Sequence, residues 1–214
     1  MPDDFARPAA DVNPDAGDHL VAADPLAVAA VDRAGAAARA KFPYVLKRFG
    51  DRGRAFTDSD GGWLVLQAAL PEPTLRSQID WLGSVLASRG MPRVILETYL
   101  LDLAQALAET LPTRKETWSK LAAQGSRLRD DRMTRVSAAC SRALAERLAH
   151  RLGPGVAPPS PDALPLLTSA LADERAGIRR AVPSLLEWLA DGVRFGSAVA
   201  AAVIDAVAAA RTVA

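Results

Sequence analysis

Residues 71–111 read PEPTLRSQIDWLGSVLASRGMPRVILETYLLDLAQALAETL, and this stretch decides the fold class. Apolar side chains recur every three or four residues in its first half, which is the period of a helix with one apolar face. These positions are Leu75, Ile79, Leu82, Val85 and Leu86. The second half repeats the period at Leu96, Tyr99, Leu100, Leu103 and Leu107. Between the halves, Gly90 can adopt the left-handed backbone that ends a helix, and Pro92 suits the first turn of the next. We therefore predict two amphipathic helices joined by a short turn.

The composition of the whole chain agrees with this local pattern. Half of the 214 residues are apolar, which is enough to build a hydrophobic core. Aromatic residues make up only 5%, alanine is abundant and β-branched runs are scarce, so helices are favoured over sheet. The sequence predicts an all-α protein, a bundle of roughly eight to ten helices without a convincing strand.

Residues 1–23 are expected to form a disordered acidic tail, because they combine scattered prolines and aspartates with little apolar surface to bury. Residues 1–32 carry seven aspartates and one arginine, so this end of the chain is negative and the remainder is positive. Two interpretations of the tail stay open. It either keeps the protein in solution, or it is an arm that folds over a basic surface and competes with an anionic partner.

The rest of the chain divides at its prolines and glycines. Residues 24–153 are expected to form the main helical bundle, opened by Asp24 as an N-cap and Pro25 at the first helical position. Residues 154–161 are rich in proline and glycine and predict a linker. Residues 162–214 then supply C-terminal helices that pack on the bundle.

The segment 113–152 leaves one question about helix number open. Thr113 and Glu116 match a capping box, in which each side chain can bond to the backbone of the other, so a long helix is expected to start there. The apolar stripe continues beyond Gly125, either as one helix kinked at that glycine or as two helices in succession.

Groups suited to catalysis are scarce in this sequence. Glu146 and His150 lie one helical turn apart, but a metal site needs further ligands, and a cation at the end of a helix explains His150 equally well. Cys140 lies on an apolar stripe, where a thiol behaves as a small hydrophobic group. No nucleophile elbow, phosphate-binding loop or dinucleotide fingerprint is present. We therefore predict no catalytic residue, no metal ligand and no cofactor.

The segment from Lys41 to Asp60 is the best candidate for a functional site, and its glycines predict a loop. Residues 41–54 hold five cations and one acid, with tyrosine and phenylalanine between them. Glycine beside arginine lets backbone and guanidinium approach one phosphate or carboxylate together. The alternative is that the aromatic residues anchor the loop while the cations pair with neighbouring acids and water. The residues predicted to contact a ligand or partner are Tyr44, Arg48, Arg52, Arg54, Asp58 and Asp60.

Composition also limits the kinds of partner. The basic residues between positions 114 and 135 lack a helix-turn-helix around them, which argues against nucleic-acid binding. The apolar run 199–210 is short and interrupted by Asp205, so we expect no membrane span. The terminal alanine- and valine-rich helix can pack against its own copy in a homodimer or complete the bundle of a monomer. A single cysteine and an acidic start without a secretory signal favour a cytoplasmic protein.

Two hypotheses about function follow from these observations. The first is a non-catalytic regulatory or adaptor protein that binds an unknown protein partner through the Lys41–Asp60 segment and the acidic tail. The second is a helical protein, or an enzyme, that holds an apolar or anionic small molecule in a pocket near residues 41–60.

Overall fold

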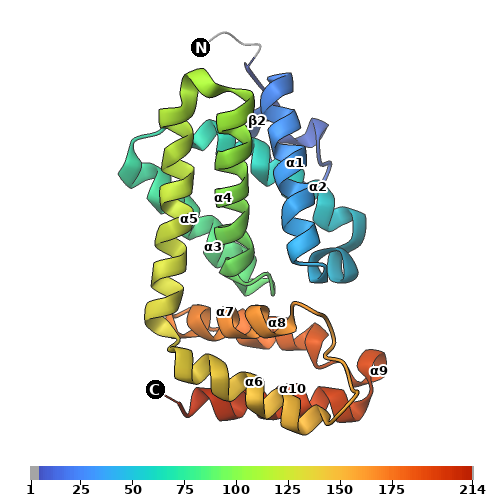
Figure 1. Ribbon diagram of the computed structural model, residues 1–214. Coiled ribbons are helices and arrows are strands. Elements are labelled where there is room, and N and C mark those ends of the chain that lie inside the picture. The colour runs from blue at the N-terminus through green and yellow to red at the C-terminus, as the bar shows by residue number, and fades with distance from the viewer. Residues whose placement is uncertain (1–4, 214) are drawn as a thin grey trace. The chain divides into compact units, whose positions relative to one another are not determined.

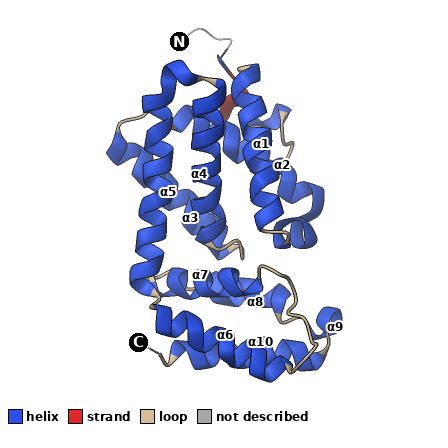
Figure 2. Cartoon of the chain, viewed as in Figure 1, coloured by secondary structure: helices blue, strands red, loops and turns tan. Residues whose placement is uncertain are grey.

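The computed structural model describes residues 5–213, and the predicted all-α architecture is confirmed over this range. The chain is helical almost throughout, apart from one small sheet (Figure 2). The helices carry the labels α1 to α10 (Figure 1). Within residues 5–213, no helix combines the length and the apolar character needed to cross a lipid bilayer.

The described chain divides into two compact units. Unit 1 contains residues 5–81 and 96–127, and unit 2 contains residues 82–95 and 128–213. The sequence predicted that residues 24–153 form one bundle, whereas these residues are divided between the two units. The reason is that α6 (Ala138–Leu152), which precedes the proline-rich segment, packs mainly against α10 (Ser197–Arg211), which follows it.

The two helices predicted on either side of Gly90 are present. Helix α3 (Glu72–Ser88) and helix α4 (Arg93–Thr110) are separated by a turn in which Gly90 has a φ of 83°, the left-handed conformation expected for a residue that ends a helix. Most positions of the predicted apolar stripes are buried, with Leu75, Ile79, Leu100, Leu103 and Leu107 at 0% exposure. Val85 and Leu86 are half-buried. Both helices contribute residues to both units, because the unit boundaries fall inside them.

The prediction of a disordered tail is wrong for residues 5–23. Strand β1 (Ala6–Pro8) pairs antiparallel with strand β2 (Leu20–Ala22), and the short helix η2 (Ala9–Asp11) lies between them. Strand β2 packs against helix α2 and buries Val21 there. A few small apolar side chains are therefore enough to fold this segment once another element covers them. Residues 1–4 of the predicted tail lie outside the described residues.

Helix α1 (Pro25–Lys41) begins as the sequence predicts. The Asp24 carboxylate accepts hydrogen bonds from the backbone N–H groups of Leu26 and Ala27, which satisfies two donors at the start of the helix. Along its length, α1 lies against α4 through a hydrogen bond from Arg33 to the carbonyl oxygen of Ala106.

The predicted loop between Lys41 and Asp60 is instead part of helix α2 (Tyr44–Gln67). Only Gly50 leaves the helical conformation, with φ 56° and ψ −144°, so it divides α2 into a short first part and a long second part. Glycine lowers helix propensity, which is why the sequence indicated a loop. Packing overrides that preference here, because Gly53, Gly61 and Gly62 are buried.

The chain from residue 113 to residue 152 forms two helices, which settles the open alternative. Helix α5 (Lys115–Arg135) follows the short helix η3 (Pro112–Arg114) and runs straight through Gly125. A Cβ atom at Gly125 would lie 3.0 Å from the carbonyl oxygen of Glu97, so this glycine permits close packing of α5 on α4 and does not mark a kink. The chain breaks later, at Val136 and Ser137.

Unit 2 is built mainly from the C-terminal helices. Helix α10 packs against α6, α7, α8 and α9 and buries a face of alanine and valine, including Val203 and Val207. The bounds of these helices are α6 (Ala138–Leu152), α7 (Ala163–Arg175), α8 (Ala181–Leu189), α9 (Gly192–Phe195) and α10 (Ser197–Arg211).

Candidate functional site

The second part of α2 contains a run of residues that are poor helix formers. Residues 57–62 read TDSDGG, yet they lie in the middle of the helix, with Ser59, Gly61 and Gly62 buried. Residues that contradict their local structure tend to be kept for packing or for function.

Three polar side chains from three helices of unit 1 meet beside this run. We call Arg39 of α1, Asp58 of α2 and Tyr99 of α4 the Tyr99 cluster. Arg39 Nη1 lies 3.8 Å from Asp58 Oδ1, which is close enough for an ion pair and too far for a hydrogen bond. These two atoms and the Tyr99 hydroxyl oxygen are buried and make no hydrogen bond with any described residue. Leaving one buried polar group unpaired costs about 1–3 kcal/mol, so such a cluster needs a reason to persist.

Two glycines make room for the cluster. A Cβ atom at Gly61 would lie 2.0 Å from the Tyr99 hydroxyl oxygen, and a Cβ atom at Gly35 would lie 2.9 Å from Arg39 Nη1. Any other residue at Gly61 would displace the tyrosine. The close approach of these groups therefore depends on glycine in both α1 and α2.

Burial dominates the electrostatics of the Tyr99 cluster. It raises the pKa of Asp58 above its ordinary value, and the neighbouring carboxylate of Asp32 adds to the rise, while Arg39 and Arg54 oppose it. Burial also raises the pKa of Tyr99, with further contributions from Asp58 and Asp60. The Tyr99 hydroxyl consequently keeps its proton and can both donate and accept a hydrogen bond.

Cations stacked on aromatic rings lie on both sides of Gly50 in α2, Arg48 before it and Arg52 after it. The guanidinium carbon of Arg48 lies 5.0 Å from the centre of the Phe49 ring, and its Nη1 donates a hydrogen bond of 2.5 Å to the Tyr44 hydroxyl. The Arg52 guanidinium lies 5.5 Å from the ring centre of Phe56. These rings orient the guanidinium groups, and the Arg52 side chain remains 70% exposed.

The N-terminal segment lies on the same helix. Asp15 Oδ2 is 2.9 Å from Arg52 Nε, and the side-chain amide of Asn13 donates to the Ser59 hydroxyl at 3.4 Å. A Cβ atom at Gly62 would lie 2.9 Å from the Val21 side chain, so strand β2 covers α2 closely at that point. The acidic segment therefore contacts the second part of α2 from its start at Arg52 to Gly62.

The residues predicted from sequence fall into two groups. Arg54 and Asp58 lie together, with Arg54 Nε 3.7 Å from Asp58 Oδ2, and Asp60 contributes its charge near Tyr99. The other group consists of Tyr44 and Arg48 in the first part of α2 and Arg52 at the start of the second part.

Sequence reasoning missed Arg39, Tyr99 and Asn13, because each comes from a segment that is distant along the chain from residues 41–60. The one available signal was at Tyr99, which is the only member of the apolar stripe of residues 96–107 with a polar tip.

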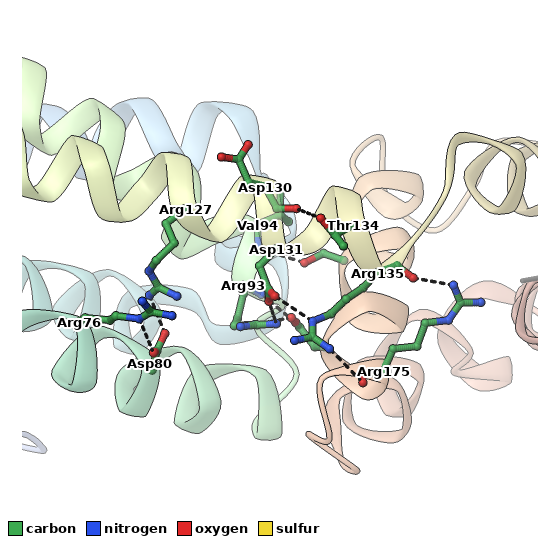
Figure 3. A network of polar contacts seen from close by, with 12 residues as sticks. Arg76, Asp80, Arg93, Val94, Arg127, Asp130, Asp131, Thr134, Arg135 and Arg175 are labelled. Atoms are coloured by element: carbon green, nitrogen blue, oxygen red, sulfur yellow. Dashed lines mark hydrogen bonds and ion pairs between the residues drawn. The ribbon is translucent and has the colours of Figure 1, made fainter. Parts of the chain in front are cut away.

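Unit 2 contains a second buried cluster of charges, which we call the Arg93 cluster: Arg93, Asp131 and Asp173. Arg93 Nε donates to Asp173 Oδ1 at 2.6 Å, its backbone N–H donates to Asp173 Oδ2 at 2.9 Å, and its Nη2 donates to Asp131 at 3.1 Å. Figure 3 shows Arg93, Asp131 and Arg135 directed toward one another, and Arg135 Nε donates to Asp131 at 3.0 Å. This network caps the start of α4, as expected of a structural cluster.

Possible metal ligands are dispersed within residues 5–213, where no three or more His, Cys, Asp or Glu side chains are arranged to hold an ion. Glu146 and His150, the pair considered from sequence, are both exposed on α6. Cys140 is buried, and its thiol lies 3.3 Å from the carbonyl oxygen of Ala210.

Comparison of the chain with models of protein families, with curated proteins and with solved structures finds no match. The geometry of α2 and of the helices around it must therefore support any functional proposal.

Proposed function

We propose that this chain is a non-catalytic regulatory or adaptor protein that binds an acidic segment of a protein partner on the face of α2 that carries Arg48 and Arg52, on either side of Gly50. One observation carries the proposal: the ion pair of 2.9 Å between Asp15 and Arg52, through which an acidic segment of the chain itself occupies this face of the helix.

The chemistry of the face suits carboxylates. Arg48 and Arg52 are held over aromatic rings, and a guanidinium group matches the paired oxygens of a carboxylate. Lys47 is exposed beside them and adds positive charge. Lys41 is already paired with Asp102 at 2.8 Å, so it is a poorer candidate for a contact with the partner.

The N-terminal segment is expected to compete with the partner. Asp15 and Arg52 are both more than half exposed, and an ion pair of this kind contributes roughly 0.2–1 kcal/mol. An acidic partner with several carboxylates can therefore displace Asp15 without unfolding β1, β2 or α2.

The experiment uses a fluorescein-labelled peptide with the sequence of residues 5–23 as the acidic probe, followed by fluorescence anisotropy on the full chain. Asp15→Asn leaves Arg52 without its internal partner, so the probe is expected to bind about twofold to fivefold more tightly. Arg52→Ala is expected to weaken binding by a similar factor. Arg179→Ala, an exposed arginine of unit 2, is the matched control and leaves binding unchanged. Equal binding to all of these variants contradicts the proposal.

The second function expected from sequence, small-molecule binding near residues 41–60, draws on a separate observation. That observation is the Tyr99 cluster, whose unpaired atoms lie on the inner side of α2.

A further inference from the structure

Three buried polar atoms that lack hydrogen bonds belong to one place in the fold. They are Arg39 Nη1, Asp58 Oδ1 and the Tyr99 hydroxyl oxygen, contributed by α1, α2 and α4. The Tyr99 side chain is buried deeply, at 4% exposure of the residue, whereas the side chains of Arg39 and Asp58 are 13% and 19% exposed. The three unpaired atoms are therefore all buried, and only other atoms of the Arg39 and Asp58 side chains reach solvent.

We propose that the Tyr99 cluster binds a small uncharged molecule that carries a hydrogen-bond acceptor and a hydrogen-bond donor on neighbouring atoms, as a primary carboxamide does. The inference is independent of the proposed protein partner, because it rests on the inner side of α2 and involves none of the stacked arginines.

The unpaired atoms define the complementary ligand. Arg39 Nη1 can only donate, so it requires an acceptor such as a carbonyl oxygen. Asp58 Oδ1 accepts when the carboxylate is charged, so it requires an N–H or O–H group. Tyr99 can donate to the same carbonyl oxygen or accept from the same N–H group. A carboxamide offers all of these groups within three bonded atoms.

The charges around the cluster select against ions. Three carboxylates, those of Asp32, Asp58 and Asp60, act on the Tyr99 hydroxyl. They outnumber the two cations at the cluster, which are Arg39 and, beside Asp58, Arg54. An anionic ligand is therefore repelled. A cationic ligand can pair with Asp58, but it offers no acceptor to Arg39 and leaves that donor unpaired in a buried place.

The glycines fix how close the ligand-binding atoms can lie. Gly61 lets the tyrosine hydroxyl rest against the backbone of α2, and Gly35 brings Arg39 Nη1 and Asp58 Oδ1 to the same part of α1. A methyl group at Gly61 would push the Tyr99 hydroxyl out of this arrangement. The sequence thus keeps two poor helix formers at the two positions where the cluster needs them.

The test is a titration of the full chain, labelled with ¹⁵N, followed by the backbone amide shifts in two-dimensional NMR spectra. Acetamide is the probe, and acetate, methylammonium and N,N-dimethylacetamide are matched probes that are anionic, cationic and without an N–H donor. We expect saturable shifts with acetamide at Asp58, Gly61 and Tyr99. The three matched probes are expected to bind at least roughly fivefold more weakly, the factor that one lost hydrogen bond produces.

A pair of tyrosine variants separates binding at the cluster from general solvent effects. Tyr99→Phe removes only the hydroxyl oxygen and is expected to weaken acetamide binding by roughly fivefold to tenfold. Tyr44→Phe is the matched control, because Tyr44 is buried and already bonded to Arg48, and it leaves the affinity unchanged. Linear, unsaturable shifts shared by all four probes overturn the proposal, as does an unchanged affinity in Tyr99→Phe. Because the selectivity series uses the unaltered protein, the test holds even if a variant folds poorly.

Discussion

Each unit of this protein buries a cluster of charges, and the two clusters differ in whether their hydrogen bonds are made. In the Arg93 cluster, one arginine donates three bonds to two carboxylates, and Arg135 supplies a further bond to Asp131. In the Tyr99 cluster, the nearest charged atoms are 3.8 Å apart and three buried atoms are unpaired. A buried charge is tolerated when it is fully bonded, and removing one partner from such a cluster is costly. The Tyr99 cluster lacks these bonds, which is why we infer that it serves binding.

The largest change in the free energy of unfolding is expected when one partner is removed from the Arg93 cluster. Arg93→Ala leaves the buried carboxylate of Asp173 without its cation and is expected to lower the free energy of unfolding by about 3–5 kcal/mol. Urea unfolding followed by circular dichroism measures this change. Arg89→Ala, an exposed arginine of the preceding turn, is the control and should stay within about 0.5 kcal/mol of the unaltered chain.

A methyl group added at Gly61 tests the packing of the Tyr99 cluster. The new Cβ atom would lie 2.0 Å from the tyrosine hydroxyl oxygen, so Gly61→Ala is expected to lower the free energy of unfolding by about 1–3 kcal/mol. Combining it with Tyr99→Phe removes the clashing oxygen and is expected to recover part of this loss. If Gly61→Ala destabilises the unaltered chain and the Tyr99→Phe variant equally, the Tyr99 hydroxyl does not lie against Gly61.

Asp131 of the Arg93 cluster and Asp58 of the Tyr99 cluster should respond to pH in opposite directions. Burial outweighs the bonds to Arg93 and raises the pKa of Asp173, so Asp173 responds in the same direction as Asp58. Hydrogen bonds from Arg135 and the charges of Arg135 and Arg93 outweigh burial and hold the pKa of Asp131 below its ordinary value. Its stabilising contribution is therefore complete above the unfolded pKa of 3.8 and is lost as the pH falls through the lower folded value. Burial raises the pKa of Asp58, so ionising it destabilises the folded state as the pH rises from 3.8 through the higher folded value.

Two asparagine variants test the opposite effects of Asp131 and Asp58 on the pH dependence of stability. At neutral pH, Asp131→Asn is expected to destabilise the protein, and Asp58→Asn is expected to leave it equally or more stable. Each difference should disappear in acid, once the carboxyl group is protonated in both the folded and the unfolded states. Unfolding free energies measured between pH 3 and pH 7 check both signs, and a loss of stability in Asp58→Asn would contradict the account.

The smallest effect is expected on the exposed side of α2. Arg52→Ala removes an ion pair whose two side chains are 70% and 55% exposed, so the free energy of unfolding should change by less than about 1 kcal/mol. A larger loss would mean that the N-terminal segment is an obligatory part of the fold and cannot yield to a partner.

The parts of the fold that were predicted correctly are those that depend on local sequence patterns. The helices on either side of Gly90 and the start of α1 at Asp24 depend on periodicity and on residues that are neighbours in the chain. Helix α2 was missed because its glycines favour a loop until Gly61 packs against Tyr99 and Gly62 against Val21.

The candidate site was only partly accessible from the sequence for the same reason. Asp58 and Arg54 belong to the segment that attracted attention, and they do lie together. Arg39 and Tyr99 come from other helices, and no local signal marks their meeting with Asp58. The prolines and aspartates of the N-terminal segment predicted disorder, so its fold was missed. Its few apolar residues, such as Val21, are buried.

The central claim is that the Tyr99 hydroxyl is kept for binding and contributes nothing to stability. The two tyrosines of the chain provide the test, because both are buried and only Tyr44 has a hydrogen-bonded hydroxyl by the distances above. In urea unfolding, Tyr44→Phe is expected to lower the free energy of unfolding by about 1.5–3 kcal/mol, the range for a bond to a charged group, while Tyr99→Phe leaves it unchanged or raised. A loss in Tyr99→Phe as large as that in Tyr44→Phe would contradict the claim.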